Sequence, residues 1–535
     1  MAAGGVPSYR SWYSVFRRAS GILLHLSSLP GCHGLGDLGP AAYRFADFLQ
    51  QAGQTWWQML PIGPLGGSNS PYDSPSAHAG NPLFISLELL VERGLLDAAD
   101  LAPNRQLAQT RRSRYLSNTR YALPRLRKAF ERFRVHASAE DRRAYDEYAH
   151  ENRDWLEDFA LFSALRAPAQ EAMAVRGSSS TAWSSWEPGV RDRVPAALSS
   201  ALGRLAEEVD FHRYLQFEFD RQWQGLRRYC TERSLRLLGD MPMFVAYEGA
   251  DVWANPGLFF LDAEGRRTVV AGVPPDYFSQ TGQRWGNPLY RWDRHTESNF
   301  AWFVSRVKGT LTRFDAVRLD HFIGFHRYWE IPAESESATV GRFLPAPGAA
   351  LLERLRAEVG LPFLAEDLGL VTPEVRALAD AFGLPGMRVL QFAFGDGAEQ
   401  YLPHRYSSNC AVYTGTHDND TAVGWFESLV PTAEGRRERR RVLDYLGSGG
   451  RQVHWDLIRV ASMSVADLAI FPLQDLLGLG SRARMNVPGT AAGNWSWRFD
   501  AADLTPAVAE RMAKLTALYG RAPAAPSETP FRSGS

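Results

Sequence analysis

Residues 314–322 read FDAVRLDHF, an apolar segment that ends in polar residues. Side chains alternate along a β-strand, so Arg318 and Asp320 would share one side of a strand with this sequence. Short apolar runs that end in this way are typical of buried strands in parallel sheets. The segment therefore predicts one strand of a parallel α/β fold, with polar groups at its carboxyl end.

Seven further segments have the same character, and helical patterns follow them. They are residues 21–29 (GILLHLSSL), 55–61 (TWWQMLP), 235–245 (LRLLGDMPMFV), 362–369 (PFLAEDLG), 388–394 (RVLQFAF), 410–418 (CAVYTGTHD) and 468–473 (LAIFPL). Eight parallel strands with polar carboxyl ends predict an α/β fold of the (β/α)8 TIM-barrel type, with inserted, largely helical subdomains. A doubly wound open sheet is the main alternative.

The spacing of these segments is uneven, which predicts the domain organisation. We expect residues 21–86 to start the barrel and residues 87–211, rich in Arg, Glu, Ala and Leu at helical periodicity, to form a helical insertion. The barrel would resume over residues 212–520, with a Gly-, Pro- and aromatic-rich loop at 246–300 acting as a lid over a site. The Pro- and Ser-rich tail, residues 521–535, is predicted to be disordered.

The composition excludes several classes of protein. The 535 residues are 45% hydrophobic, and 59 basic residues balance 59 acidic ones, which leaves no electrostatic footprint for nucleic acid or an anionic membrane. The amino terminus lacks a signal-peptide core, and no stretch approaches the roughly 20 apolar residues that span a bilayer. The widely spaced Cys32, Cys230 and Cys410 predict free thiols and a cytoplasmic protein. We make no prediction of oligomeric state.

Three carboxylate clusters fall at the ends of predicted strands. Arg318 beside Asp320 would keep that carboxylate ionised, as a nucleophile requires. Glu366 follows the apolar run LPFLA, and apolar walls raise the pKa of a carboxyl group toward that of a general acid. His417 and Asp418 close a third strand. Hydrogen bonding to a sugar suits them better than metal binding, because the repeated His spacing of zinc sites is missing.

Each cluster alone has a structural explanation, as a buried ion pair or a strand-end cap. Their convergence at one barrel mouth is harder to explain structurally. Retaining glycoside chemistry needs two carboxyl groups roughly 5 Å apart, one as nucleophile and one protonated, and Asp320 and Glu366 are the predicted pair. Aromatic and amide residues suit sugar rings, although packing is the commoner role for any one of them; they gather at 70–72, 276–278, 283–287 and 494–497.

One motif points to a different chemistry. Residues 34–39, GLGDLG, match G-x-G-x-x-G and precede a helical run at 41–51, as in a dinucleotide-binding fold. However, residues 30–33 make the turn long, and the next strand ends in Leu60-Pro61, without the acidic residue that would bind a ribose. A nucleotide-dependent enzyme is therefore a remote alternative.

The chain resembles the 4-alpha-glucanotransferases called amylomaltases or disproportionating enzymes. The similarity runs from about residue 21 to 81 and from about 239 to 498. It is carried by SPYDSPSAHAGNP (70–82), GDMPMFVA (239–246), VAGVPPDYFSQTGQRWGNPLY (270–290), VRLDHFIGFHRYWEIPA (317–333), LAEDLG (364–369), FGLPGMRVLQFAF (382–394), YTGTHDNDT (413–421) and ARMNVPGTAAGNWSWR (483–498). A match of so many long motifs in the same order is not expected by chance.

The resemblance implies a (β/α)8 barrel that transfers α-1,4-glucan segments between maltooligosaccharides and releases glucose by a retaining double displacement. It implies that Asp320 is the nucleophile that forms a glucosyl-enzyme intermediate, that Glu366 is the acid and then the base, and that Asp418 holds hydroxyls of the distorted sugar. It implies neither cofactor nor metal. The residues implied to bind substrate are Tyr72, Asp240, Asp276, Gln283, Trp285, Asn287, Arg318, His417 and Asn494.

Two positions depart from the family pattern. His78 stands where phenylalanine is common, and Glu248-Gly249 stand where an Asp-Ser pair is common. Two alternative functions also follow from the same residues. An amylase-like hydrolase would resolve the intermediate with water. A non-catalytic glucan-binding barrel would be expected to have lost at least one of the three carboxylates.

Overall fold

Eight parallel strands form a closed barrel in the computed structural model, which describes residues 16–102, 107, 110–176, 182–275, 281–490 and 492–523. Their order around the barrel is β1-β12-β11-β10-β9-β6-β3-β2. The strands are β1 (Ala19–Leu23), β2 (Trp56–Gln58), β3 (Arg236–Met241), β6 (Ala316–Leu319), β9 (Phe363–Ala365), β10 (Gly386–Val389), β11 (Cys410–Tyr413) and β12 (Leu468–Pro472). The predicted (β/α)8 barrel is confirmed. The open-sheet alternative is wrong, because β1 pairs with both β2 and β12.

Each predicted strand segment overlaps one barrel strand, but the strands are shorter than predicted. The segment predicted at 388–394 is strand only as far as Val389, after which Leu390–Phe392 form a 3-10 turn. Both parts are apolar and largely buried, and periodicity does not separate a buried strand from a buried turn. Strands β1, β6, β11 and β12 are buried throughout, as expected for a parallel sheet covered on both faces.

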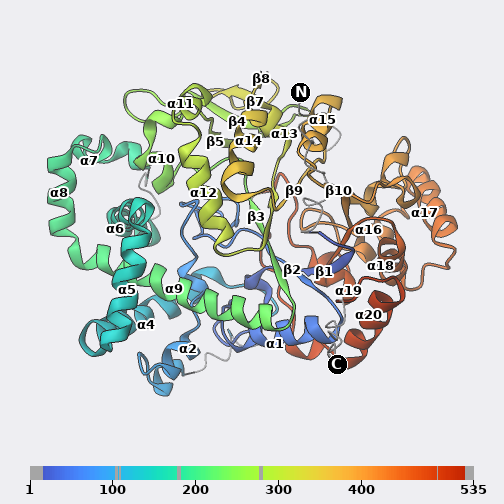
Figure 1. Ribbon diagram of the computed structural model, residues 1–535, viewed down its shortest axis with the longest axis horizontal. Coiled ribbons are helices and arrows are strands. Elements are labelled where there is room, and N and C mark those ends of the chain that lie inside the picture. The colour runs from blue at the N-terminus through green and yellow to red at the C-terminus, as the bar shows by residue number, and fades with distance from the viewer. Residues whose placement is uncertain are drawn as a thin grey trace, which may run out of the picture.

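Helices surround the barrel (Figure 1). The longer ones are α1 (Pro40–Gln51), α9 (Ala206–Glu232), α12 (Ala301–Leu311), α14 (Gly348–Val359), α15 (Pro373–Ala381), α17 (Ala433–Leu446), α18 (Val453–Met463) and α20 (Pro506–Leu518). Shorter ones are α10 (Ala250–Ala254), α11 (Trp292–Glu297), α13 (Ile323–His326), α16 (Ala422–Ser428) and α19 (Leu473–Leu476). Between β10 and β11, a stretch described in full, the chain makes 3-10 turns instead of an α-helix.

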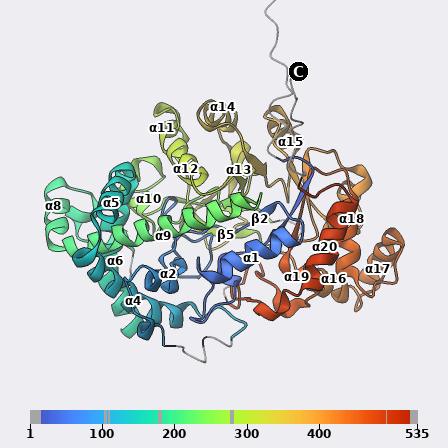
Figure 2. The same ribbon diagram turned by 60° about the horizontal axis from the view of Figure 1, so that its bottom comes forward.

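A lobe of helices separates β2 from β3 in the chain and lies on one side of the barrel, at the left of Figure 1. It contains α2 (Leu87–Glu92), α4 (Tyr115–His136), α5 (Ala139–Glu151), α6 (Arg153–Arg176), α7 (Pro188–Arg191) and α8 (Pro195–Arg204). The long helix α9 packs against α4, α5 and α6 and also against α1 of the barrel. Figure 2 shows α9 running from the lobe to the barrel, so this helix connects the two.

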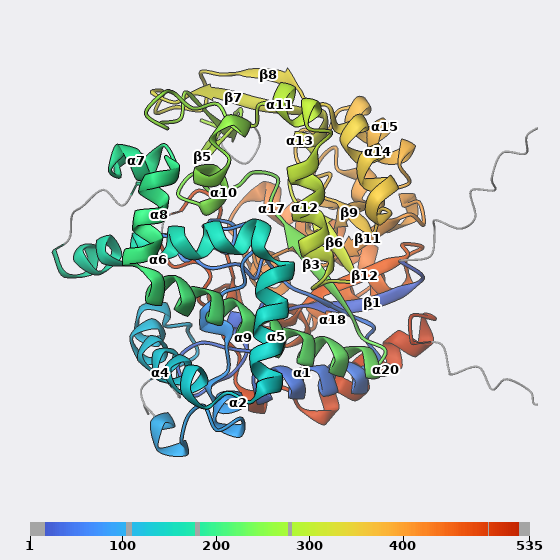
Figure 3. The same ribbon diagram turned by 60° about the vertical axis from the view of Figure 1, so that its left-hand side comes forward.

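A second, antiparallel sheet lies outside the barrel. Its order is β5-β4-β7-β8, formed by β4 (Val269–Val273), β5 (Gln283–Pro288), β7 (Arg327–Pro332) and β8 (Arg342–Pro345). Figure 3 shows β7 and β8 along its upper edge. These strands were not predicted, since β4 and β5 fall within the Gly-, Pro- and aromatic-rich stretch 246–300. The sheet exists because that stretch pairs with β7, more than fifty residues further along the chain.

The carboxyl-terminal part of the described chain packs against the amino ends of barrel strands β1 and β12. Arg521, the first residue of the predicted disordered tail, is fully buried, and its guanidinium donates hydrogen bonds of 2.8 Å to the carbonyl oxygens of Ala19 and Ala466. The tail prediction is therefore wrong at this residue, because the side chain satisfies buried carbonyls near β1 and β12. Residues 524–535 lie outside the described residues.

All three cysteines are free, as predicted from their spacing. Within the described ranges, no helix is both long and apolar enough to span a membrane.

Candidate active site

The carboxylates singled out in the sequence follow barrel strands at their carboxyl ends. Asp320 comes directly after β6, Glu366 directly after β9, and Asp418 lies in the turn beyond β11. Asp240 lies within β3, next to Met241 at the strand's end. Since β3, β6 and β9 are neighbours in the parallel barrel, their carboxyl ends meet at one mouth.

Arg318 binds two of these carboxylates at once. Its Nη1 atom lies 2.9 Å from both carboxylate oxygens of Asp240 and 2.9 Å from Oδ1 of Asp320. The predicted contact between Arg318 and Asp320 is confirmed, and Asp240 is an additional partner. Burial alone would lower the pKa of Arg318, but the two carboxylates raise it well above its usual value. Burial raises the pKa of Asp240, although Arg318 opposes this shift.

Glu366 lies in a contrasting environment. Its Oε1 accepts a hydrogen bond from the Leu368 amide at 2.9 Å, and Oε2 accepts one from the His321 amide at 2.8 Å. Burial, which is the largest cause, and the charge of Asp320 together raise the pKa of Glu366 to about 8, against the opposing effects of Arg318 and of the two backbone hydrogen bonds. The carboxyl group is therefore mostly protonated at neutral pH, which is the state that a general acid requires.

His321 is a site residue that sequence reasoning missed, although it directly follows Asp320. Its φ of 51° lies in the left-handed region, which is uncommon for a residue with a side chain. This backbone conformation accompanies the bond from its amide to Glu366, and the ring lies edge-on to Trp285 with centroids 4.8 Å apart. Strained backbone of this kind is frequent at functional sites. Burial lowers the pKa of His321 to about 4, so the ring is neutral at pH 7.

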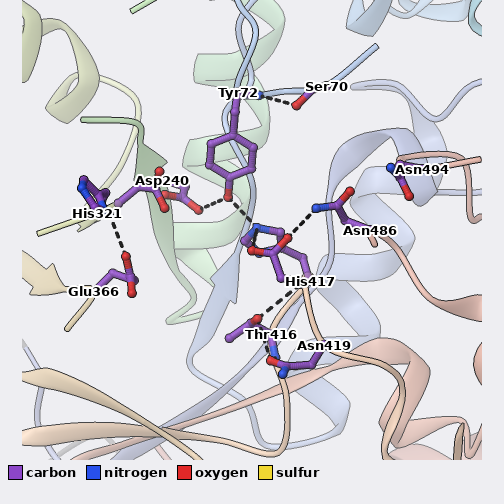
Figure 4. Close-up of polar contacts among 12 residues, drawn as sticks. Ser70, Tyr72, Asp240, His321, Glu366, Thr416, His417, Asn419, Asn486 and Asn494 are labelled. Atoms are coloured by element: carbon purple, nitrogen blue, oxygen red, sulfur yellow. Dashed lines mark hydrogen bonds and ion pairs between the residues drawn. The ribbon is translucent and has the colours of Figure 1, made fainter. Parts of the chain in front are cut away.

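Tyr72 joins two sides of the barrel mouth (Figure 4). Its hydroxyl donates a 2.7 Å hydrogen bond to Oδ2 of Asp240 and lies 2.9 Å from Nε2 of His417. The Tyr72 and His417 rings are stacked, with centroids 5.3 Å apart. Burial and the nearby Asp240 charge raise the pKa of Tyr72 well above its usual value, so the phenol remains protonated.

Asp418 is the most exposed of the three carboxylates, with 44% of its side chain accessible. Its Oδ1 accepts a 2.6 Å hydrogen bond from Nδ2 of Asn486, and Oδ2 lies 3.5 Å from Nε2 of His417. The turn before it is held by Asn419, whose Oδ1 accepts hydrogen bonds from the amide and the hydroxyl of Thr416 (Figure 4). Sequence reasoning missed Asn486, although it lies in the motif ARMNVPG.

Three predicted substrate-binding residues belong to β5. Nε1 of Trp285 donates to Oε1 of Gln283 at 3.2 Å, and 39% of Trp285 is exposed. The Asn287 side chain instead donates a 2.9 Å hydrogen bond to the carbonyl oxygen of Val245, which links β5 to the segment that follows β3.

The remaining two substrate-binding predictions are Asn494 and Asp276. Asn494 bonds within its own loop, where its amide donates to the carbonyl of Thr490 at 3.0 Å and accepts from the Val487 amide at 3.0 Å. Asp276 lies outside the described residues.

The two positions that depart from the family pattern both contact the helical lobe. His78 stacks on Trp155 of α6 with centroids 5.7 Å apart, and Glu248 accepts a 3.4 Å hydrogen bond from the Trp183 amide. Nε2 of His78 also lies 3.9 Å from Oδ1 of Asp251 in α10, so both positions pack against elements outside the barrel strands.

The G-x-G-x-x-G motif has a packing role. A Cβ atom on Gly36 would lie 2.1 Å from the carbonyl oxygen of Leu26, so this glycine is needed for close packing against the preceding turn. Oδ1 of Asp37 accepts a 2.8 Å hydrogen bond from the amide of Gly39, the residue before α1. A carboxylate at that amide occupies the place that a bound phosphate would need.

Across the described part of the chain, no group of three or more His, Cys, Asp and Glu side chains is arranged to hold a metal ion. The site is built instead from carboxylates, one arginine, a tyrosine and two histidines at the carboxyl ends of barrel strands. This combination of fold and site places the protein in the class of (β/α)8-barrel enzymes.

Comparison with known proteins assigns the family. A sequence profile of the 4-alpha-glucanotransferase family matches residues 24–504. The 4-alpha-glucanotransferase of Synechocystis sp. is 46% identical over 516 residues, which cover 94% of this chain and 98% of the relative. That of Thermus thermophilus is 46% identical over 511 residues, with the same coverage of both chains.

Solved structures agree with this assignment. An amylomaltase from Streptococcus agalactiae, in complex with acarbose, superposes with a TM-score of 0.88 at 34% identity and covers 95% of this chain and 100% of its own. The amylomaltase from Corynebacterium glutamicum shares the fold, with a TM-score of 0.76 at 20% identity over 93% of this chain and 75% of its own. The chain belongs to the 4-alpha-glucanotransferase family and is a transferase of that type.

Proposed function

We propose that this enzyme moves α-1,4-glucan segments between maltooligosaccharides and releases glucose, through a retaining double displacement. The observation that carries the proposal is the contrast between two carboxyl groups at the ends of adjacent strands. Asp320 lies 2.9 Å from the Arg318 cation, whereas burial raises the pKa of Glu366 to about 8. An ionised carboxylate beside a protonated one is what a retaining mechanism requires.

In the first step, a carboxylate oxygen of Asp320 attacks the anomeric carbon, while Glu366 gives its proton to the oxygen of the bond that breaks. The shortened glucan leaves with that proton, and a covalent glucosyl ester remains on Asp320. Arg318 stabilises the carboxylate before attack and again when it leaves.

In the second step, Glu366 acts as the base. Ester formation removes the negative charge of Asp320, which is one of the causes that raise the pKa of Glu366. The pKa of Glu366 then falls, so its carboxylate can take the proton of an acceptor hydroxyl as that oxygen attacks the glucosyl ester. Asp320 is released and the anomeric configuration is restored.

The substrate-binding residues are proposed to divide between the two sides of the cut bond. Tyr72, Asp240, His417 and Asp418 would hold the donor sugar, because Tyr72 is hydrogen-bonded to Asp240 and His417, and His417 lies 3.5 Å from Asp418. Gln283, Trp285 and Asn287 would line the acceptor side, and Asp276 and Asn494 are proposed to bind neighbouring sugars. We further propose that residues 246–300 act as a lid, since an acceptor site that excludes water favours transfer over hydrolysis.

Free cysteines support a cytoplasmic location.

Incubation with maltotriose tests the proposed reaction. Transfer is expected to yield glucose together with maltooligosaccharides longer than maltotriose, while the total number of reducing ends stays constant. The chain-length distribution and the reducing ends are measured in the same samples. Rising reducing ends without longer products would mean hydrolysis, and no turnover would overturn the proposed reaction altogether.

The raised pKa of Glu366 predicts the alkaline limit of activity. The protonated acid is present below its pKa of about 8 and is lost as the pH rises through that value. We therefore expect kcat/KM, which reports the free enzyme, to fall about tenfold per pH unit above that point. Initial rates at low maltotriose concentration between pH 5 and 10 measure this limb. A limb centred below about pH 6 would contradict the assignment of the acid.

A further inference from the structure

The loop that carries Tyr72 is held by helices outside the barrel. The carbonyl of Pro75 accepts a 2.8 Å hydrogen bond from the amide of Ala250, and the amide of Ala77 donates a 2.7 Å hydrogen bond to Oδ2 of Asp251. Ala250 and Asp251 belong to α10. Each bond engages the main chain of the loop, so these contacts determine where its backbone lies.

A further attachment comes from α9. Gln216, which is completely buried, accepts a 2.7 Å hydrogen bond from the amide of Gly80 and donates a 3.0 Å hydrogen bond to the carbonyl of the same residue. A Cβ atom on Gly80 would lie 2.1 Å from the ring of Phe219, one turn further along α9. The loop and the helix are thus in direct contact, with no room for a side chain between them.

The position of Tyr72 depends on this attachment because its hydroxyl must meet two separate partners. It bonds Asp240 at 2.7 Å and His417 at 2.9 Å, and these residues come from different parts of the barrel. Gly80 is only eight residues further along the chain. A shift of the loop by an ångström would break one or both contacts, since hydrogen bonds tolerate little change in length.

We propose that Gln216 is a positioning residue, through which helix α9 sets the place of Tyr72 in the donor-sugar site. The helix that connects the lobe to the barrel thereby contributes to catalysis without touching substrate. This inference rests on the proposed role of Tyr72 in holding the sugar.

Gln222 provides a matched control on the same helix. It is also buried, and it accepts a 2.7 Å hydrogen bond from the Ser86 amide and donates a 3.2 Å hydrogen bond to the Ser86 carbonyl. Ser86 lies six residues beyond Gly80 and caps α2, away from Tyr72. Gln222 also donates a 2.8 Å hydrogen bond to Oε1 of the buried Glu218. Replacing either glutamine with methionine keeps the volume nearly constant, but it removes two of these hydrogen bonds at Gln216 and three at Gln222, so Gln222→Met should lose at least as much thermal stability as Gln216→Met.

The experiment compares kcat/KM for maltotriose in Gln216→Met, Gln222→Met and Tyr72→Ala, together with the doubly substituted Gln216→Met/Tyr72→Ala. We expect Gln216→Met to lower kcat/KM on the order of 10- to 100-fold, because small misplacements of a site residue are costly. Gln222→Met should stay within about threefold of the wild type. In the Tyr72→Ala background, Gln216→Met should add less than about twofold, because no tyrosine remains to be positioned. If Gln216→Met does not fold, Gln216→Asn, which keeps the amide but shortens its reach, takes its place.

The outcomes separate this inference from the proposed function. Equal losses in Gln216→Met and Gln222→Met, or multiplicative effects in the double variant, would overturn the positioning role while leaving that of Tyr72 intact. An undiminished kcat/KM in Tyr72→Ala would overturn both. A loss specific to Gln216→Met that vanishes in the double variant supports the inference.

Discussion

Asp320→Asn is expected to lower kcat/KM for maltotriose on the order of 10⁴-fold or more, the size of loss seen when a nucleophile is removed. The amide is a poor nucleophile and carries no charge, so no glucosyl ester forms, and Arg318 loses its ion pair with Asp320 while keeping the one with Asp240. Glucose release and the distribution of longer products are measured together. Mass spectrometry of acid-quenched enzyme should find a glucosylated peptide containing Asp320 in the wild type alone.

Asp315→Asn serves as the control on the same segment of chain. Asp315 precedes β6 at the opposite end of the strand, where its Oδ2 accepts a 2.8 Å hydrogen bond from the Leu237 amide. This substitution should leave kcat/KM within about threefold, because it lies away from the barrel mouth. If Asp320→Asn kept a tenth of the wild-type activity, Asp320 would not be the nucleophile.

Glu366→Gln is expected to have the second largest effect and to depend on the leaving group. With maltotriose, kcat/KM should fall about 10²- to 10⁴-fold, the usual contribution of general acid catalysis. With α-glucosyl fluoride the first step should remain fast, because fluoride departs without protonation. Stopped-flow measurement should then detect a burst of fluoride followed by slow turnover, since the base of the second step is missing. The alkaline limb near pH 8 should also disappear.

The neighbouring carboxylate supplies the comparison. Asp367 accepts a hydrogen bond of 2.6 Å from the Met387 amide and one of 3.0 Å from Arg388, so it ties β9 to β10. Asp367→Asn should lower thermal stability yet retain the alkaline limb and show no preference for the fluoride substrate. If the loss in Glu366→Gln were equal for both substrates, Glu366 would not be the proton donor.

Much of the candidate site could be predicted because its signals are local. A buried parallel strand must be apolar along its length and can be polar only where it ends, so the end of each apolar run located a carboxylate such as Asp320 or Glu366. The contact between Arg318 and Asp320 followed from the alternation of side chains along one strand.

Other features of the site were beyond such reasoning because they join distant segments. Asp240 shares the guanidinium of Arg318 only because β3 and β6 pair in the barrel. No sequence pattern indicates the left-handed backbone of His321, because a histidine at that position is equally compatible with the common negative-φ conformations. The bond from Asn486 to Asp418 spans nearly seventy residues.

The amino-acid sequence by itself determined the barrel, its eight strands and the carboxylates at their ends, because hydrophobic burial imposes a pattern on consecutive residues. Only the tertiary structure decided the electrostatics of the site and the support of Tyr72. The pKa of Glu366 depends on burial by the whole fold and on the charge of Asp320, and the loop that carries Tyr72 is hydrogen-bonded at Gly80 to Gln216, far along the chain. Such properties arise when distant segments exclude water together, and no local pattern specifies them.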